Sequence, residues 1–219
     1  MTVRLVRERG SATSFHARPI PEPPSPQIWV FDVERPAIVL GSTQGDEVLD
    51  LVACAAAGVE VARRRSGGGV VLLEPGAIVW FDVLVPAAQL HAAGVGDDVR
   101  GSMIWLGSHI GRTLTELGVP GLDVHRGATA CSAWCPLVCF AGTGPGEVTQ
   151  DGAKLVGISQ RRTRAASRFQ CAVHMVWSPD RLAPLLRAHP SVGELPHVAE
   201  LDRQIAEQLP DALATALTA

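Results

Sequence analysis

The chain has 219 residues, of which 47% are hydrophobic and 19% are charged, and its formal net charge is −3. This size suffices for one well-packed domain, and the negative charge argues against a nucleic-acid-binding protein, which needs a basic face. No apolar run approaches the roughly 20 residues of a membrane span. Met1–Gly10 is too charged for the apolar core of a signal peptide. We therefore expect a cytoplasmic protein without nucleic-acid or membrane partners.

The first 27 residues are rich in arginine and then in proline, a composition that favours extended or polyproline structure over helix. We predict an N-terminal arm at residues 1–27 and a single domain at 28–219. Strand and helix signals then alternate, and we predict strands at 28–33, 37–40 and 59–62 and a helix at 45–57.

A cluster of arginine and glycine follows, with the sequence RRRSGGG from Arg63 to Gly69. Glycine has no Cβ, so this backbone can approach a ligand closely and present its N–H groups, which suits an anion such as phosphate. The pattern is neither a P-loop nor a dinucleotide fingerprint. Strands are predicted instead at 70–73 and 77–85, on either side of a turn at 74–76. Taken alone, the stretch fits a glycine-rich hairpin with a solvated basic rim equally well.

The clearest helix signal begins at Asp97-Asp98 and ends at Gly118. Asp151-Gly152 predicts a hairpin turn, after which Lys154 begins an apolar strand, where a solvated strand-end lysine is the simplest interpretation. Further strands are predicted at 122–126, 136–140, 154–159 and 169–177, and a helical tail from about 178, with helices at 200–209 and 211–217.

The five cysteines are an odd number, and because nothing indicates secretion we expect free thiols and no disulfide framework. Cys131, Cys135 and Cys139 recur at intervals of four, with His125 just upstream. Metal motifs mostly use tighter pairs such as C-x-x-C, and no second pair completes a four-ligand shell. We therefore predict no metal site.

Several of these stretches together resemble the lipoate-protein ligase and octanoyltransferase family, which is related to biotin protein ligases. They are RRRSGGG, the Glu74-Pro75-Gly76 turn, and DGAKLVGISQRR from Asp151. PAIVLGSTQ, ending at Gln44, is similar to the family's strand that ends in Gly-x-x-Gln. The resemblance covers about residues 28–177. It implies an α+β fold, a mixed and largely antiparallel β-sheet covered by α-helices, with the motifs at one end of the sheet.

The resemblance also implies a site. It places Lys154 against the acyl carbonyl and phosphate, and substrate or adenylate binding at Arg64, Arg65, Ser66, Gly67, Gly68, Gly69, Gln44, Gly157 and Ser159. In the octanoyltransferase branch, a cysteine at the position of Cys139 carries the acyl group as a thioester, and a nearby lysine would favour its thiolate. The alternative for Cys139 is a buried small hydrophobic residue.

The implied enzyme attaches lipoate or octanoate to a lysine of the lipoyl carrier domains of 2-oxoacid dehydrogenase or glycine cleavage proteins. A ligase would use ATP and Mg²⁺ and form an acyl-adenylate. An octanoyltransferase would instead take its acyl group from acyl carrier protein through Cys139.

Two departures from the family pattern keep a third alternative open. Leu73 and Gln170 stand where many relatives have histidine, so a non-catalytic binder of acylated carriers is the further hypothesis. The chain also lacks an obvious copy of the small C-terminal domain of bipartite ligases, which makes an accessory ligase subunit a further expected partner.

Overall fold

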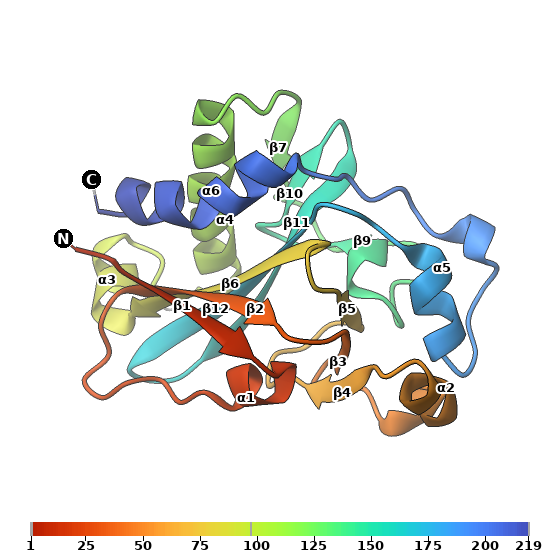
Figure 1. The fold of residues 1–219 in the computed structure, drawn as a ribbon. Coiled ribbons are helices and arrows are strands. Elements are labelled where there is room, and N and C mark those ends of the chain that lie inside the picture. The colour runs from red at the N-terminus through yellow and green to blue at the C-terminus, as the bar shows by residue number, and fades with distance from the viewer. Residues whose placement is uncertain (1, 97, 219) are drawn as a thin grey trace.

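Two β-sheets pack against each other in the computed structural model, which describes residues 2–96 and 98–218 (Figure 1). The larger sheet has the strand order β1-β2-β6-β12-β11-β10-β7. In that order its strands span Arg4–Gly10, Gln27–Val33, Ile78–Pro86, Ala166–His174, Ala153–Arg162, Val148–Gln150 and Leu122–Val124. Only the β1–β2 pair is parallel, and the other five pairs are antiparallel.

The smaller sheet has the order β4-β3-β5, with β3 parallel to β4 and antiparallel to β5. Its strands span Glu60–Arg63, Ala37–Leu40 and Val71–Leu73, and a separate ribbon joins β8 (Ala130–Cys131) to β9 (Gly142–Thr143). Trp29, Phe31 and Trp80 of the larger sheet pack against Val39 and Leu73 of the smaller one. A hydrophobic layer therefore separates the two sheets.

Helices α4 (Val99–Glu116) and α6 (Arg203–Ala216) cover the other face of the larger sheet (Figure 1). Leu106, Ile110 and Leu114 of α4 recur every four residues, which places them on one helix face, and all three are fully buried. The shorter helices are α1 (Ala12–Ala17), α2 (Leu51–Ala56), α3 (Ala87–Ala92), α5 (Pro179–Leu182), η1 (Asp46–Val48), η2 (Cys139–Ala141), η3 (Ala183–Leu185) and η4 (Val192–Glu194). The predicted α+β class, with a mixed and largely antiparallel sheet covered by helices, is confirmed.

Several local predictions are wrong. The predicted helix at 45–57 is two short helices, η1 and α2, because Leu49 between them is extended, with φ −100° and ψ 147°. The N-terminal segment is not a separate arm, since its strand β1 pairs with β2 at the edge of the sheet. It also contains helix α1, which Ser11 caps by accepting from the Ser14 N–H. The predicted strand at 136–140 is a loop that ends in η2, where Val70 donates to the carbonyl of Leu137. The two predicted C-terminal helices form one continuous α6 with Pro210 inside it. Of the predicted Asp97-Asp98 helix start, Asp98 is the N-cap residue, and Asp97 lies outside the described residues.

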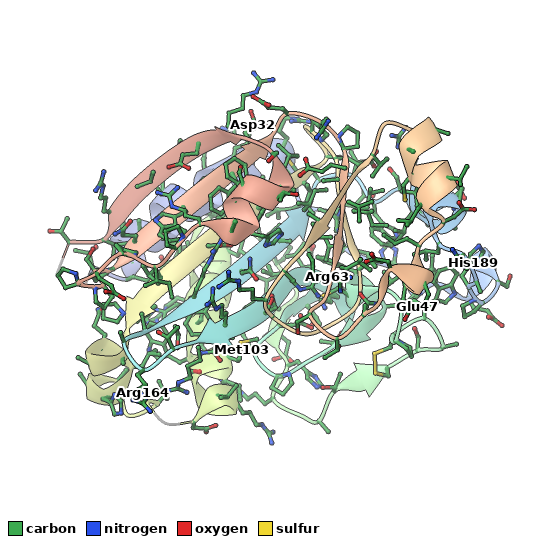
Figure 2. All side chains as sticks on the ribbon, turned by 90° about the horizontal axis from the view of Figure 1, so that it is seen from below. Asp32, Glu47, Arg63, Met103, Arg164 and His189 are labelled. Atoms are coloured by element: carbon green, nitrogen blue, oxygen red, sulfur yellow. A yellow bond between two sulfur atoms is a disulfide. The ribbon has the colours of Figure 1, made fainter. Side chains whose placement is uncertain are left out.

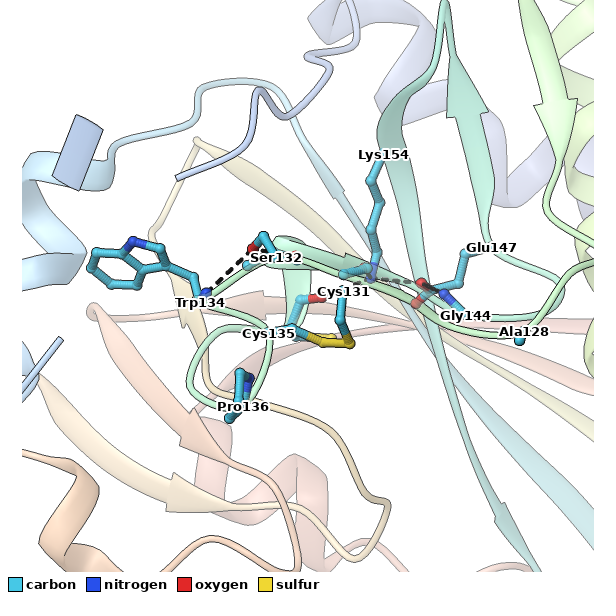
Figure 3. The surroundings of a disulfide bond; sticks show 12 residues. Ala128, Cys131, Ser132, Trp134, Cys135, Pro136, Gly144, Glu147 and Lys154 are labelled. Atoms are coloured by element: carbon cyan, nitrogen blue, oxygen red, sulfur yellow. Dashed lines mark hydrogen bonds and ion pairs between the residues drawn. A yellow bond between two sulfur atoms is a disulfide. The ribbon is translucent and has the colours of Figure 1, made fainter. Parts of the chain in front are cut away.

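The expectation of free thiols is wrong for one pair, because the structure joins Cys131 to Cys135 in a disulfide (Figure 3). Between the two cysteines the chain turns, and the Cys135 N–H donates to the carbonyl of Ser132. The Cα atoms of Cys131 and Cys135 are 5.2 Å apart, within the usual range for a disulfide. Cys54, Cys139 and Cys171 are free. Among the described residues no helix is both long and apolar enough to cross a membrane.

A buried ion pair in the middle of the larger sheet links the sheet to helix α1. The Arg168 Nε atom lies 2.5 Å from Asp82, and their side chains are 2% and 0% exposed. Burial raises the pKa of the Asp82 carboxyl, and the Arg168 charge opposes that shift. Arg168 also donates to the carbonyls of Phe15, at 2.8 Å, and Arg18, at 3.0 Å, at the end of α1. The pair therefore holds α1 on the sheet.

We expect Asp82→Asn to destabilise the protein by about 3–5 kcal/mol, because it leaves the buried Arg168 charge unpaired. Urea unfolding followed by circular dichroism measures this change. Asp32→Asn is the matched control, since Asp32 lies at the surface (Figure 2) and pairs with Arg9 at 3.6 Å with both side chains more than half exposed. The control should change stability by less than about 1 kcal/mol. Equal effects of the two variants would contradict the role given to Asp82.

Candidate active site

A cavity of about 40 Å³ lies between the two sheets. The smaller sheet contributes Val39, Val71 and Leu73 to its wall, and η2 contributes Cys139 and Phe140. The wall on this side is therefore almost entirely apolar.

The larger sheet forms the opposite wall, and its strand register sets the order of the side chains there. Trp80 of β6 pairs with Ala172 of β12, which pairs with Gly157 of β11. Two residues further along, and so on the same face, Gln170 pairs with Ser159. The row formed by Trp80, Ala172 and Gly157 is apolar, and the next row, formed by Gln170 and Ser159, is polar. All five residues line the cavity.

The glycine-rich loop between β4 and β5 borders the cavity. Gly68 has φ +100°, and a Cβ on the neighbouring Gly41 would lie 1.8 Å from the Gly68 carbonyl oxygen, so both positions require glycine. No hydrogen bond among the described residues uses the N–H groups of Gly67, Gly68 or Gly69. The loop therefore presents free donors, as an anion site needs.

Arg64 shapes this loop from inside. Its guanidinium is buried and donates to the carbonyls of Gly67, at 2.9 Å, and Gly69, at 2.7 Å. Burial lowers the pKa of Arg64. Arg65 is exposed, and no ion pair joins it to a carboxylate among the described residues. Of the two arginines, Arg65 is the one whose charge is open to a ligand.

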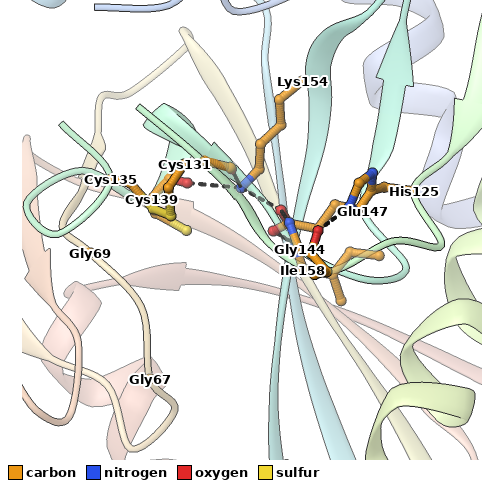
Figure 4. Close-up of polar contacts among 12 residues, drawn as sticks. Gly67, Gly69, His125, Cys131, Cys135, Cys139, Gly144, Glu147, Lys154 and Ile158 are labelled. Carbon is orange, nitrogen blue, oxygen red and sulfur yellow. Dashed lines mark hydrogen bonds and ion pairs between the residues drawn. A yellow bond between two sulfur atoms is a disulfide. The ribbon is translucent and has the colours of Figure 1, made fainter. Parts of the chain in front are cut away.

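Lys154 of β11 does not itself line the cavity, but its Nζ atom lies over the ring of Phe140, which does, at 5.0 Å from the ring centroid. Figure 4 shows the polar contacts of Lys154. Lys154 is 4% exposed, so the solvated strand-end interpretation is wrong. Its Nζ atom pairs with Glu147 at 2.7 Å and donates to the carbonyls of Cys139, at 2.8 Å, and Gly142, at 2.9 Å. These three partners match the three protons of the ammonium group.

Glu147 is in turn fixed by the backbone, since its two carboxylate oxygens accept from the N–H groups of Ile158, at 3.0 Å, and Gly144, at 2.7 Å. The Lys154–Glu147 pair thus ties the 139–147 segment to strand β11. The acid was not among the predicted site residues. The sequence did offer a signal for it, because Glu147 directly precedes the first strand of the predicted hairpin and Lys154 lies at the start of the second.

Cys139 is half-buried and lines the cavity, and a Cβ on Gly68 would lie 3.9 Å from its sulfur. No hydrogen bond to this sulfur exists among the described residues. Lys154 contacts the Cys139 carbonyl and not its thiol.

Four of the eleven predicted residues line the cavity, and Lys154 and the loop residues 65–69 do not. Arg64, Cys139, Gly157 and Ser159 line the cavity, and Ser66 hydrogen-bonds to Ser159 at 2.9 Å. Gln44 does not line it. Its side chain accepts from Gly41 and donates to the carbonyls of residues 136 and 137, and so connects two loops.

Sequence analysis missed His16, which comes from α1 and lines the cavity beside Gln170. No sequence signal marked it, because its segment carries no motif. Across the described chain, no group of three or more His, Cys, Asp or Glu side chains is placed to hold a metal ion.

The fold is that of the lipoate-protein ligases. A T. acidophilum protein assigned as a lipoate protein ligase, with bound lipoic acid, superposes with a TM-score of 0.71 at 16% identity, over 100% of this chain and 86% of that one. Lipoate-protein ligase A bound with ATP gives the same four values. A bi-partite ligase of Thermoplasma acidophilum, studied with its E2 lipoyl domain, gives 0.65 at 16% identity, over 100% and 84%.

The chain belongs to the lipoyl protein ligase A/B catalytic domain family, whose model matches residues 14–218. The resemblance stated from the motifs is therefore confirmed. No curated protein matches the chain.

The stability of the protein should fall as the pH drops below 6.5. Burial is the main cause that lowers the pKa of His16 to about 3 and of His174 to about 4, from an ordinary 6.5. Between pH 6.5 and these values the unfolded chain binds more protons than the folded one. Each histidine then removes up to about 1.4 kcal/mol of stability per pH unit.

Unfolding free energies in urea at about pH 7 and about pH 5 test this expectation. His174→Gln should reduce the loss between the two pH values. His197→Gln is the control, since His197 is exposed, and should leave the loss unchanged. An unchanged loss in His174→Gln would contradict the assignment.

Proposed function

We propose that the protein is a lipoate-protein ligase that attaches lipoate or octanoate to a lysine of lipoyl carrier domains through an acyl-adenylate. The observation that carries this proposal is the shape of the site. A largely apolar cavity is lined by Arg64, which binds two carbonyls of the glycine-rich loop, and by Phe140, whose ring centroid lies 5.0 Å from the buried Lys154 ammonium. The family membership supports the same reading.

In the first step, the acyl carboxylate would attack the α-phosphorus of ATP and pyrophosphate would leave. The N–H groups of the glycine-rich loop and the exposed Arg65 would stabilise the phosphate charge, and Mg²⁺ would accompany the nucleotide as part of the substrate. The apolar walls around Leu73 and Phe140 would hold the acyl chain and exclude water.

In the second step, the amine of the carrier lysine would attack the acyl carbonyl carbon, AMP would leave, and the amine would release its proton to solvent. Lys154 would donate to the carbonyl oxygen as negative charge develops on it. Because all three of its protons are already used, the substrate oxygen must replace one of the carbonyls of Cys139 and Gly142. The 139–142 segment is thus the part of the site that would adjust to the substrate.

Similar proteins support the choice of substrates. One has bound lipoic acid, one has bound ATP, and one was studied with an E2 lipoyl domain. For this chain we infer carrier domains of 2-oxoacid dehydrogenase or glycine cleavage proteins as acceptors. The last relative is bi-partite, and an accessory subunit is a corresponding proposal here.

Cys139 favours a second candidate, an octanoyltransferase that needs no ATP. Its thiol lines the cavity, and a Cβ on Gly68 would lie 2.8 Å from the Arg64 guanidinium and 3.9 Å from the Cys139 sulfur, so both groups flank the same glycine. The thiolate would attack the thioester of octanoyl carrier protein and release the carrier thiol. The carrier-domain lysine would then take the acyl group from Cys139.

The intact mass of an apo lipoyl domain decides between these candidates. With free lipoate or octanoate, ATP and Mg²⁺, we expect the mass of one added acyl group, and Cys139→Ser should retain this activity. Modification only from octanoyl carrier protein, abolished by Cys139→Ser, would establish the transferase. Tight binding without modification in either mixture would indicate a non-catalytic binder.

The role of Lys154 is testable in the same assay. Lys154→Met should lower the rate of acyl transfer by about 10²–10³-fold, the usual loss for one donor to a developing oxyanion. It also leaves Glu147 buried and unpaired, so Lys154→Met/Glu147→Gln, which removes both charges, is the control for stability. An acyl-transfer rate near that of the parent in the double variant, at equal folded fraction, would rule out this role.

A further inference from the structure

A buried polar cluster in the cavity wall joins the glycine-rich loop to β11, β12 and helix α1. Ser66 Oγ donates to Gln170 Oε1 at 2.8 Å, and the Ser159 hydroxyl lies 2.9 Å from Ser66 Oγ. Because this fixes the Gln170 oxygen toward Ser66, its amide Nε2 faces His16 and donates to Nδ1 at 2.9 Å. The chain of hydrogen bonds therefore ends on His16.

The position of the His16 proton follows from this chain. Nδ1 accepts a hydrogen bond, so the neutral imidazole carries its hydrogen on Nε2. The ring stays neutral because burial, with the charges of Arg168 and Arg64, lowers its pKa to about 3. His16 is 8% exposed, and Nε2 has no partner among the described residues. An unpaired buried donor is unfavourable by about 1–3 kcal/mol, so a ligand acceptor beside it is expected.

The strand register gives the distance of this donor from the reactive side. Lys154 and Phe140 converge on Gly157 of β11, where a Cβ would lie 3.0 Å from the Phe140 ring. His16 instead stacks on Trp80 of β6, at 4.5 Å. Trp80 and Gly157 flank Ala172 on neighbouring strands, so they are about 10 Å apart, two strand spacings. An extended lipoyl or octanoyl chain has this scale.

His16 is held firmly in this position. The Trp80 indole donates to Asp82 at 2.9 Å, which fixes the ring on which His16 stacks. Arg168 binds the carbonyls at the end of α1 and so fixes the helix that carries His16. The donor is therefore part of a rigid wall, as a specificity-determining group should be.

We propose that His16 Nε2–H donates to an acceptor atom at the distal end of the acyl group, and that the cavity therefore selects lipoyl over octanoyl. The acceptor is a sulfur of the dithiolane ring, a weak acceptor that the hydrocarbon end of octanoate lacks. An octanoyl chain leaves the donor unpaired. This inference rests on the proposed function for its class of substrate and adds which acyl group the site prefers.

The sharpest test compares two ligands of the same shape on the unmodified protein. Lipoate and 5-cyclopentylpentanoate differ only in the two sulfur atoms, which carbon replaces. Isothermal calorimetry should show that lipoate binds roughly 3- to 10-fold more tightly, as expected for one hydrogen bond. Equal affinities, or tighter binding of the carbon analogue, would overturn the proposal whether or not variants fold.

A second experiment tests whether the preference for lipoate depends on His16. His16→Phe keeps an aromatic ring on Trp80 and removes the donor, and it should bring the two affinities to within about twofold of each other. His197→Phe, the same substitution at an exposed histidine that does not line the cavity, should keep the ratio of the unmodified protein. A ratio unchanged by His16→Phe would assign the selectivity elsewhere and refute the role of His16.

The outcomes separate this inference from the proposed function. If the protein acylates lipoyl domains but binds lipoate and its carbon analogue equally, the function stands and the inference fails. If the protein binds neither acid and modifies no carrier domain in any mixture, both fail.

Discussion

The buried pair of Arg168 and Asp82 is the interaction on which the site depends. A fully buried ion pair is stable only when both charged groups also make further hydrogen bonds, and both Arg168 and Asp82 do so. Asp82 also accepts from the Trp80 indole, while Arg168 also binds two carbonyls of α1. One pair thus fixes a cavity wall and the N-terminal helix that supplies His16.

The reactive side of the cavity is organised differently, by groups whose hydrogen bonds are already complete. Lys154 uses its three protons within the protein, and Arg64 is committed to the glycine loop. The N–H groups of the loop, by contrast, have no partner among the described residues. Under the proposed function, a phosphate would therefore meet unpaired donors at the loop, whereas a carbonyl oxygen at Lys154 would have to replace one of its present partners.

The two departures from the family pattern meet in this cavity. Leu73 and Gln170, the two positions at which the sequence analysis expected histidine from the resemblance, both line its wall. Among the described residues, the only imidazole that lines this cavity is that of His16, which reaches it from a different element and contacts Gln170. The wall is therefore polar at Gln170 and His16 and apolar at Leu73.

The sequence by itself determined the class of fold, most strands, the long α4 helix and the loop residues Arg64 to Gly69, because these depend on local periodicity, turn residues and motifs. It also indicated Lys154 and Cys139. Tertiary structure alone decided that Lys154 is buried with Glu147 and that Arg64 faces inward. It also decided that His16 joins the site, because α1 is held there by Arg168, 150 residues away in the chain from Arg18. Such contacts depend on packing between distant segments, which local sequence patterns do not encode.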